Sequence, residues 1–383
     1  MAHEVFISYS SLDKTVADAA CAALENTAIL CWIAPRDVQQ GVFYPGQITR
    51  AIKSSEVMVL IFSANSNASD DVLREVQLAA TSHLHIVQFR IEDVVPNDDL
   101  LYYLSAPQRL DALTPPLESN LQRLGASVKA LLEMGLGKVA ALYQKADDDQ
   151  GSAYAQFMLG WLYKNGQGVP KDLGKAAELY QKAADQGLAN AQSDLGLLYA
   201  NGQGVPMDLQ KARELYQKAA DQRLAAAQYN LGTVYQNGEG VPKNLGRAAE
   251  LFQKAADQGL ADAQYYLGRL YENGQGVPKD LGKAAELFQK AADQGYADAQ
   301  NNLGALYANG QGIPNDFGKA AELFQKVADQ GLAAGQFNLG QLYADGQGVP
   351  KDLAKAAELF QKAADQGDQV ASANLKRLSR RRK

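Results

Sequence analysis

The residue best suited to chemistry is a single carboxylate, Glu75, in the stretch 63–78. The apolar run 57–62 that precedes it is typical of a buried strand. A Ser/Asn-rich loop follows, and Ser69 or Asp70 can cap a helix there by accepting from its first free N–H groups. Glu75 then lies in the second turn of that helix, near the carboxyl end of a strand, where open α/β sheets bind ligands. The sequence therefore predicts a ligand site around Glu75.

Alternating strand and helix patterns over the first 134 residues predict the sheet that positions this carboxylate. Apolar and β-branched runs indicate strands at 4–9, 29–33, 57–62 and 85–91, and a short edge strand at 109–113. Helical spacing indicates helices at 14–25 and 47–54, one that begins at 69 or 70, and one from 117 to about 134. The segment around Pro96 and Asp98 is expected to be a polar loop. Strands that alternate with helices imply a parallel sheet covered on both faces.

Composition limits the class of protein. The 383 residues are 46% hydrophobic and 21% charged, as in soluble proteins with two or three domains. A formal net charge of −6 argues against nucleic acid as a partner. We expect no secretion signal and no membrane span, and hence a cytoplasmic protein, because no leader pattern and no long apolar run occurs. Cys21 and Cys31 lie in apolar segments and are expected to be buried thiols.

Four sequence blocks, in this order, closely resemble a bacterial Toll/interleukin-1 receptor (TIR) domain. They are Phe6-Ile7-Ser8-Tyr9-Ser10, Cys31-Trp32-Ile33-Ala34-Pro35-Arg36-Asp37, Val59-Leu60-Ile61-Phe62-Ser63 and Arg74-Glu75-Val76. The resemblance covers about residues 1–134 and implies a flavodoxin-like α/β domain with about five parallel strands.

The resemblance also implies an activity, because many TIR domains cleave NAD+ at the nicotinamide–ribose bond. Their catalytic glutamate matches Glu75, although Val72 stands near the place of a tryptophan that the family often has. The chemistry suits a carboxylate: nicotinamide leaves as a neutral ring, and a fixed negative charge stabilises the oxocarbenium-like ribose. Attack by water or by the adenine of the same molecule gives ADP-ribose or a cyclic ADP-ribose isomer. NAD+ is then a substrate, and no cofactor is expected.

Further substrate-binding residues follow from the same resemblance, each with a plainer alternative. Phe6, Ser8 and Ser10 at the end of the first strand, and Trp32, are expected to line the nucleotide pocket, but Phe6 and Trp32 also suit the core. Glu75 itself could be an ordinary solvated helix residue. The histidines have no metal-like partners, so no metal site is expected.

The long loop after the second strand is the expected site of self-association. It carries Arg36, Asp37, Phe43 and Tyr44. In the TIR family this loop docks on a neighbouring TIR domain and helps to complete the NAD site. A local ion pair between Arg36 and Asp37 that shapes the loop is the alternative.

The rest of the chain repeats with a period of 36 residues. The units begin at Gly151, Gly187, Arg223, Gly259, Gly295 and Gly331, a partial unit begins at Gly367, and 138–150 matches the second half of a unit. Each unit is expected to form two helices, with Gly-x-Gly-Val-Pro ending the first and Asp208 or its equivalents capping the second. Gly196 and its equivalents at the tenth position are expected to let two helices approach closely.

The repeat pattern over residues 138–380 resembles Sel1-like repeats, which are relatives of the tetratricopeptide repeat. The resemblance implies an all-α solenoid that binds a protein or small-ligand partner and has no catalytic activity of its own. We therefore expect a TIR domain at 1–134, a junction and half-repeat at 135–150, and a solenoid with a C-terminal cap at 151–383. Lys376 at the tenth position of the last unit and the basic stretch 380–383 suit such a cap.

The fourth, seventh, eighth and eleventh positions vary most between units and fall on one face of the first helices, which predicts a partner-binding groove. Its main candidate residues are Tyr154, Phe157, Trp161, Tyr229, Tyr265, Tyr266 and Arg269. Neutral variation on a solvated face is one alternative. For Tyr154, Phe157 and Trp161, packing against the TIR domain is another.

Together these patterns predict an NAD+ hydrolase effector of bacterial immunity or stress, whose solenoid senses a partner and promotes assembly. A non-enzymatic TIR adaptor or scaffold for protein–protein signalling is the principal alternative. A translocated mimic that acts on a host pathway is a third.

Overall fold

The computed structural model describes residues 3–34, 44–104, 109–114, 116–133, 140–141, 143–145, 147–148 and 151–381. It divides into two compact units, Met1–Pro242 and Lys243–Lys383, and each is described by itself. In this part of the chain, every helix is too short or too polar to span a lipid bilayer. The domain boundaries expected at 134 and 150 fall among residues outside the described ranges and stay predictions.

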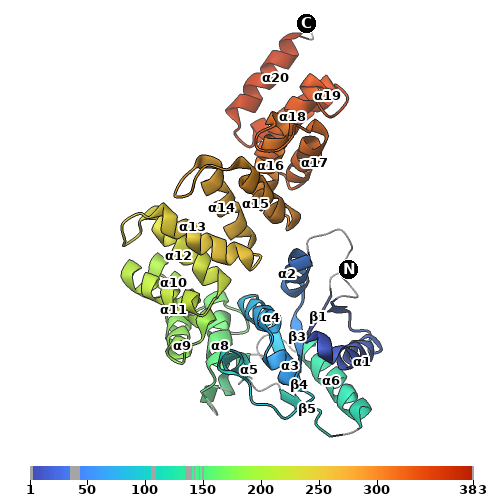
Figure 1. The fold of residues 1–383 in the computed structure, drawn as a ribbon, viewed down its shortest axis with the longest axis vertical. Coiled ribbons are helices and arrows are strands. Elements are labelled where there is room, and N and C mark those ends of the chain that lie inside the picture. Colours follow the sequence, from blue (N-terminus) through green and yellow to red (C-terminus); the bar gives the residue numbers. More distant parts are fainter. Residues whose placement is uncertain are drawn as a thin grey trace. The chain divides into compact units, whose positions relative to one another are not determined.

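A five-stranded parallel sheet forms the centre of the N-terminal α/β domain (Figure 1). Its strand order is β2-β1-β3-β4-β5. The strands are β1 (Val5–Ser8), β2 (Cys31–Ile33), β3 (Val57–Phe62), β4 (His85–Arg90) and β5 (Arg109–Asp111). β3 is buried along its whole length, as its unbroken apolar sequence predicts for an interior parallel strand. The flavodoxin-like α/β fold expected for this region is therefore confirmed.

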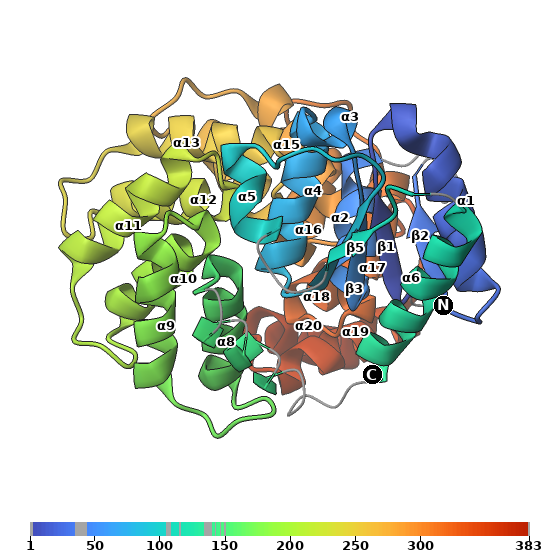
Figure 2. The same cartoon turned by 90° about the horizontal axis from the view of Figure 1, so that it is seen from below.

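Helices cover both faces of the sheet (Figure 2). Helices α1 (Lys14–Glu25) and α6 (Leu117–Leu132) pack on one face, and α2 (Tyr44–Ser54) and α4 (Asp70–Thr81) on the other. Alternation along β1 sends Val5 and Ile7 to the α1/α6 face and Phe6 to the α2/α4 face. Ser8, two residues after Phe6, therefore faces α4. Cys21 and Cys31 are buried in the α1/α6 layer, as expected.

Two segments that the sequence predicted as loops contain helices. The Ser/Asn stretch after β3 forms α3 (Ala64–Asn67), because the Ser63 hydroxyl accepts from two backbone N–H groups in a capping box. The segment around Asp98 forms α5 (Asp98–Leu104), which Asn97 caps by accepting from the Leu100 backbone N–H at 2.9 Å. Both helices begin at polar capping residues, and for this reason their sequences resemble loops.

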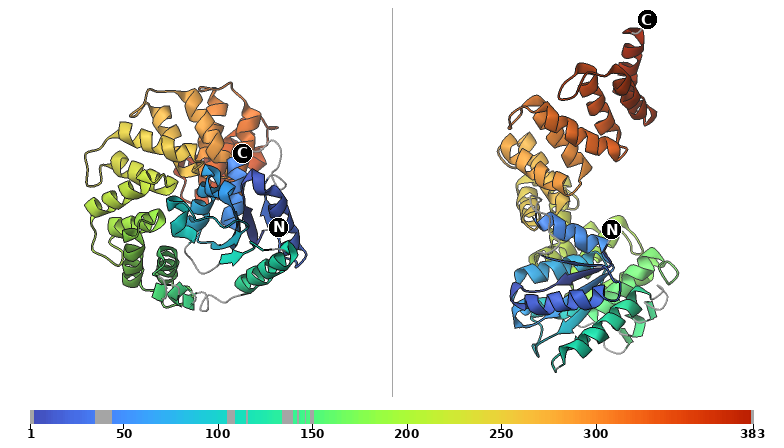
Figure 3. Two further views of the ribbon diagram at one scale, coloured as in Figure 1. Left: turned by 60° about the horizontal axis from the view of Figure 1, so that its bottom comes forward. Right: turned by 90° about the vertical axis from the view of Figure 1, so that its right-hand side faces the viewer.

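The repeats form helix pairs as predicted, and Figure 3 shows neighbouring pairs packed on one another within each unit. The first helices are α8 (Ala153–Asn165), α10 (Ala189–Asn201), α12 (Ala225–Asn237), α14 (Ala261–Asn273), α16 (Ala297–Asn309) and α18 (Ala333–Asp345). The second helices are α9 (Leu173–Asp185), α11 (Leu209–Asp221), α13 (Leu245–Asp257), α15 (Leu281–Asp293), α17 (Phe317–Asp329) and α19 (Leu353–Asp365), and α20 (Gln369–Arg381) follows them.

The tenth-position glycines permit close helix–helix contacts, as expected, at Gly160, Gly196, Gly268, Gly304 and Gly340. A Cβ atom on Gly196 would lie 2.8 Å from the ring of Tyr216 on α11. The aromatic ring of the second helix therefore packs directly on the backbone of the first. The predicted caps are also present, since Gly202 ends α10 with φ 64° and Asp208 accepts from the Lys211 backbone N–H at 2.9 Å.

Candidate functional site

The candidate site lies at the point where the connections of the sheet change direction. β1 lies between β2 and β3 in the sheet. The connection that leaves β1 leads to β2 on one side, and the connection that leaves β3 leads to β4 on the other side, so the two connections run in opposite directions. In such sheets the ligand crevice opens at the carboxyl ends of the two strands. Ser8 is the last residue of β1, and Ser63 follows β3 directly.

Glu75 and Ser8 meet at this point. The Ser8 hydroxyl donates a hydrogen bond to Glu75 Oε2 at 2.6 Å, across 67 residues of sequence. Ser8 is buried and Glu75 is half-buried. Ser69 caps α4 by accepting from the Val72 backbone N–H, which fixes the start of the helix and hence the face on which Glu75 lies.

The environment of Glu75 favours its protonated form. Burial raises the pKa of Glu75 from 4.5 to about 7, and the nearby Asp71 carboxylate adds to the rise. The hydrogen bond from Ser8 and the charge of Arg74 act in the opposite direction. A carboxyl group with a pKa near 7 changes its charge at neutral pH, as is typical of carboxylates at functional sites.

Asp13 is a second carboxylate at this edge of the sheet, and the sequence analysis missed it. It lies in a short 3₁₀ turn (Ser11–Asp13), is only 7% exposed, and accepts from Ser63 Oγ at 2.6 Å and from Asn65 Nδ2 at 3.1 Å. These bonds join the end of β1 to α3. No apolar periodicity marks such a contact, because it links two turns distant in sequence. Among the described residues, no group of three His, Cys, Asp or Glu side chains could hold a metal ion.

The predicted pocket residues Phe6, Trp32 and Ser10 occupy different environments. Phe6 and Trp32 are buried and stack on each other at 5.2 Å between ring centroids, with an interplanar angle of 14°. Both side chains therefore pack in the core, which the sequence analysis gave as the alternative to substrate binding. Their contact with substrate stays a prediction. Ser10 is half-buried, and its carbonyl accepts from the Asp13 backbone N–H at 2.7 Å.

Residues of the expected self-association loop are largely outside the described part of the chain. Arg36, Asp37 and Phe43 lie outside it, and Tyr44 begins α2 without a described side chain. Their roles stay predictions.

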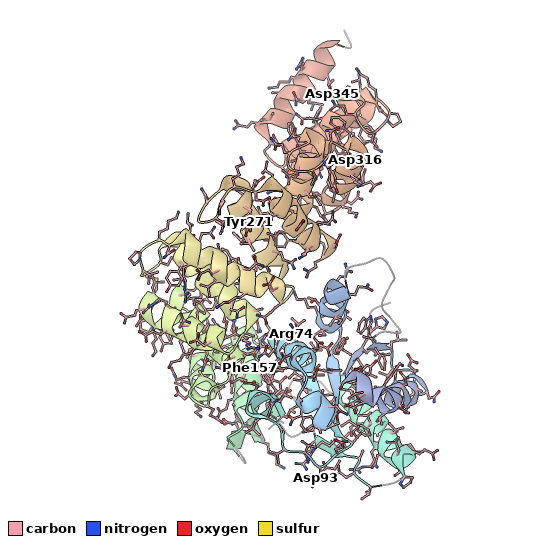
Figure 4. The ribbon with its side chains drawn as sticks, viewed as in Figure 1. Arg74, Asp93, Phe157, Tyr271, Asp316 and Asp345 are labelled. Atoms are coloured by element: carbon pink, nitrogen blue, oxygen red, sulfur yellow. The ribbon has the colours of Figure 1, made fainter. Side chains whose placement is uncertain are left out.

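Three residues of the expected partner groove instead contact the α/β domain, which corrects that part of the groove. Tyr154 is buried and donates to the Leu84 carbonyl at 2.7 Å. Phe157 and Trp161, also on α8, stack on the ring of His83 at 5.5 Å and 4.4 Å between centroids. Figure 4 labels Phe157 on α8 and Arg74 on α4. Tyr154 and Phe157 are buried and Trp161 is half-buried in this contact.

The second repeat continues this contact with hydrogen bonds to α4 and α5. Asn190 on α10 donates to Thr81 Oγ1 at 2.6 Å, and its amide oxygen accepts from the Tyr103 hydroxyl at 2.9 Å. The helix that carries Glu75 is therefore held at its C-terminal end by the repeats. Separately, His85 Nδ1 on β4 lies 2.8 Å from the Tyr143 hydroxyl.

The remaining groove candidates lie on later repeats of the two units. Tyr229 on α12 is half-buried. In the second unit, Tyr265 is 8% exposed, Tyr266 is half-buried, and Arg269 is exposed while its guanidinium donates to the Tyr265 hydroxyl at 3.0 Å.

Comparison with protein families agrees with this architecture. The TIR domain model matches residues 5–124, and the Sel1 repeat model matches six consecutive segments between residues 153 and 368, more than half of the chain. None of the curated proteins matches this sequence.

Among the solved structures that resemble the chain, two share its fold over more than half of its length. One is c5321, a protective antigen present in uropathogenic Escherichia coli strains displaying an SLR fold, with 27% identity and a TM-score of 0.61. The match covers 81% of this chain, which spans 65% of the length of c5321. The other is a Sel1 repeat protein from Oxalobacter formigenes, with 33% identity and a TM-score of 0.54, covering 60% of this chain and 96% of that protein.

Proposed function

Because the chain is a member of the Sel1 repeat family with an N-terminal TIR domain, we propose that it is an NAD+ hydrolase whose repeats bind a regulatory partner. Glu75 is the residue proposed to support cleavage of the nicotinamide–ribose bond. The observation that carries the proposal is the position of Glu75, half-buried beside Ser8 where β1 and β3 present their carboxyl ends.

The proposed reaction needs one negative charge and no acid. The bond between the ribose C1′ and the nicotinamide nitrogen breaks, and its electron pair neutralises the cationic ring. The ribose becomes oxocarbenium-like, and the Glu75 carboxylate stabilises this charge more strongly in a half-buried site than it would in water. Attack by water then gives ADP-ribose and a proton, and attack by the adenine of the same molecule gives a cyclic ADP-ribose isomer and likewise a proton.

Glu75 is about half ionised near pH 7 before substrate binds. A cationic nicotinamide ring nearby favours the charged form, so substrate binding and ionisation support each other. The proposed role of Ser8 is to hold Glu75 Oε2 in a fixed position through its hydrogen bond.

The repeats are proposed to control the TIR domain through the contact at α4. Asn190 and Tyr154 bind groups at or just after the end of α4. A partner that moves the first repeats would therefore act on the helix that carries Glu75. Self-association of TIR domains through the loop that carries Arg36 and Tyr44 is the proposed second requirement.

The test is NAD+ cleavage by the purified full chain over a wide range of protein concentration, with products identified by mass spectrometry. Glu75→Gln keeps the shape of the side chain and can still accept from Ser8, but it cannot carry a charge. We expect the variant to lose on the order of 10²-fold or more in turnover, comparable with the loss of one stabilising group in other enzymes.

Glu118→Gln is the matched control, since Glu118 is an exposed carboxylate on α6, which packs on the opposite face of the sheet. It should leave turnover unchanged. A rise in turnover per molecule with protein concentration would support the need for self-association. Full turnover by Glu75→Gln would refute the proposed role of Glu75.

One observation favours the adaptor alternative. The Glu75 carboxyl already accepts a hydrogen bond from a buried serine, which is also the pattern of a residue that only stabilises the fold. An adaptor would release no nicotinamide at any protein concentration, while TIR self-association would persist in Glu75→Gln.

A further inference from the structure

The second unit contains a cluster of three tyrosines on neighbouring repeats. Tyr265 and Tyr266 on α14 meet edge to face, with 5.3 Å between ring centroids. Tyr296, directly before α16, lies 5.1 Å from Tyr265 at an angle of 33°. Tyr266 and Tyr296 are half-buried, so part of each is accessible to solvent.

The cluster departs from the rest of the repeat array. At the second position, where Tyr296 stands, the neighbouring units have leucine, as at Leu260 and Leu332. Two tyrosines in succession at the seventh and eighth positions occur only in the unit of Tyr265 and Tyr266. Core packing explains a leucine at the second position, but it does not require tyrosine hydroxyls at the surface.

Carboxylates accompany the rings. The fourth positions of these two units carry Asp262 and Asp298, where other units have Tyr, Asn or Ala. Burial raises the pKa of Tyr296 above its ordinary value, and the charges of Asp262 and Asp298 add to the rise. Asp262 is half-buried and Asp298 is exposed.

One cation already lies in the cluster. Arg269 has its guanidinium 5.9 Å from the Tyr265 ring centroid and pairs with Glu272 at 3.3 Å. Glu272 and Asp298 both stabilise the charge of Arg269, and Asp262 adds a further carboxylate beside Tyr296. The surplus of negative charge beside aromatic faces favours a second cation.

The chain itself provides a precedent for cations on tyrosine. Tyr271, labelled in Figure 4, also lies on α14, and the Lys283 ammonium group lies 5.2 Å from its ring centroid. The same lysine–tyrosine contact recurs in other repeats, at Tyr163–Lys175, Tyr199–Lys211, Tyr307–Lys319 and Tyr343–Lys355. Those lysines come from the second helix of the same repeat.

We propose that Tyr265, Tyr266, Tyr296, Asp262 and Asp298 form a docking surface, the tyrosine–aspartate patch, for a lysine-bearing segment of a partner protein. The lysine stem packs on the accessible tyrosine rings and its ammonium group pairs with the two aspartates. The inference rests on the proposed function in one respect, the assignment of partner recognition to the repeats.

The test measures binding of a fluorescein-labelled oligolysine peptide to the full chain by fluorescence anisotropy at physiological salt. The double variant D262N/D298N should weaken binding about five- to tenfold. Tyr266→Ala should weaken it, and Tyr266→Phe, which keeps the ring, should not. An acetyl-lysine peptide of the same length should bind the wild-type chain no better than it binds the double variant.

The matched control is E286Q/E322Q, which removes the same charge from exposed positions on the second helices α15 and α17. Equal weakening by the control would show general electrostatic attraction and overturn the proposal, as would unchanged binding by D262N/D298N. All variants are made in the Glu75→Gln background and compared by circular dichroism. Binding is then read without turnover, so a failure of the NAD+ hydrolase proposal leaves this result interpretable.

Discussion

Replacement of Glu75 by glutamine tests whether the fold suppresses the charge of this carboxyl group. Glutamine keeps the shape of the side chain and can accept the hydrogen bond that Ser8 Oγ donates at 2.6 Å. The variant therefore removes the ionisation and leaves the packing. Any difference in stability that changes with pH then reports the ionisation of Glu75.

The sign follows from the direction of the pKa shift. The pKa of Glu75 rises from 4.5 to about 7 in the fold, so the folded chain binds this proton more tightly than the unfolded chain. The stability from the protonated group is complete below about pH 4.5 and is lost as pH rises to about 7. Each pKa unit is worth about 1.4 kcal/mol, which sets an upper limit of roughly 3.5 kcal/mol on the stability difference. Solvent screening of a half-buried group reduces the expected difference to roughly 1–2 kcal/mol.

The assay is urea unfolding of the full chain, followed by tryptophan fluorescence. The chain has two tryptophans, and both report on the first unit, since Trp32 is in the core of the α/β domain and Trp161 stacks on His83. Glu75→Gln should match the wild type near pH 4.5 and exceed it by roughly 1–2 kcal/mol at pH 8.5. An equal difference at both pH values, or a less stable variant at pH 8.5, would refute the reasoning. Glu118→Gln should show neither effect.

Three further predictions concern the packing of the repeats. Burial lowers the pKa of His83 from 6.5 to about 3, so the stability that depends on its neutral form is present above about pH 6.5 and lost on acidification. Asparagine tolerates the positive φ of 61° at this position. In the same unfolding assay, His83→Asn should therefore reduce the loss of stability between pH 6.5 and 5 by roughly 1 kcal/mol. Asn190→Ala leaves the buried Tyr103 hydroxyl without this partner and should cost about 1–3 kcal/mol, visible as faster hydrogen exchange in α4 and α5. Gly196→Ala places a Cβ 2.8 Å from an aromatic ring and should lower the melting temperature, whereas Gly174→Ala, where the nearest atom is 3.4 Å away, should leave it unchanged or raise it.

Local pattern was enough to predict most elements of the α/β domain. The apolar run 57–62 matches β3, and helical spacing over 14–25 matches α1, because interior parallel strands and amphipathic helices carry their own periodicity. The Ser69 cap placed Glu75 in the second turn of α4, where the structure has it. The same local reading failed at α5, since its buried residues follow a short polar segment that resembles a loop.

Contacts across long sequence separations could not be predicted in this way. Ser8 and Glu75 were both candidates, yet their hydrogen bond depends on the register of β1 against α4, which no local pattern specifies. The network around Asp13 depends on the meeting of two turns. Variation between repeats marked Tyr154 and Trp161 as unusual, but it did not decide whether the α/β domain or a separate partner covers them.

Helix α4 connects the proposed catalytic residue with the repeats that are proposed to control it. Ser8 holds Glu75 in the second turn, and Asn190 from the second repeat holds Thr81 in the last residue of the helix. A helix of 12 residues moves as one element, because its continuous internal hydrogen bonds leave no weak position at which it could bend. A shift of the first repeats at Thr81 therefore displaces Glu75 relative to Ser8, and a displacement of about 1 Å at a reacting group is enough to change a rate by two orders of magnitude. In the proposed mechanism, control of the TIR domain by its own repeats would therefore need no large rearrangement, only a change in the contact between Asn190 and this helix.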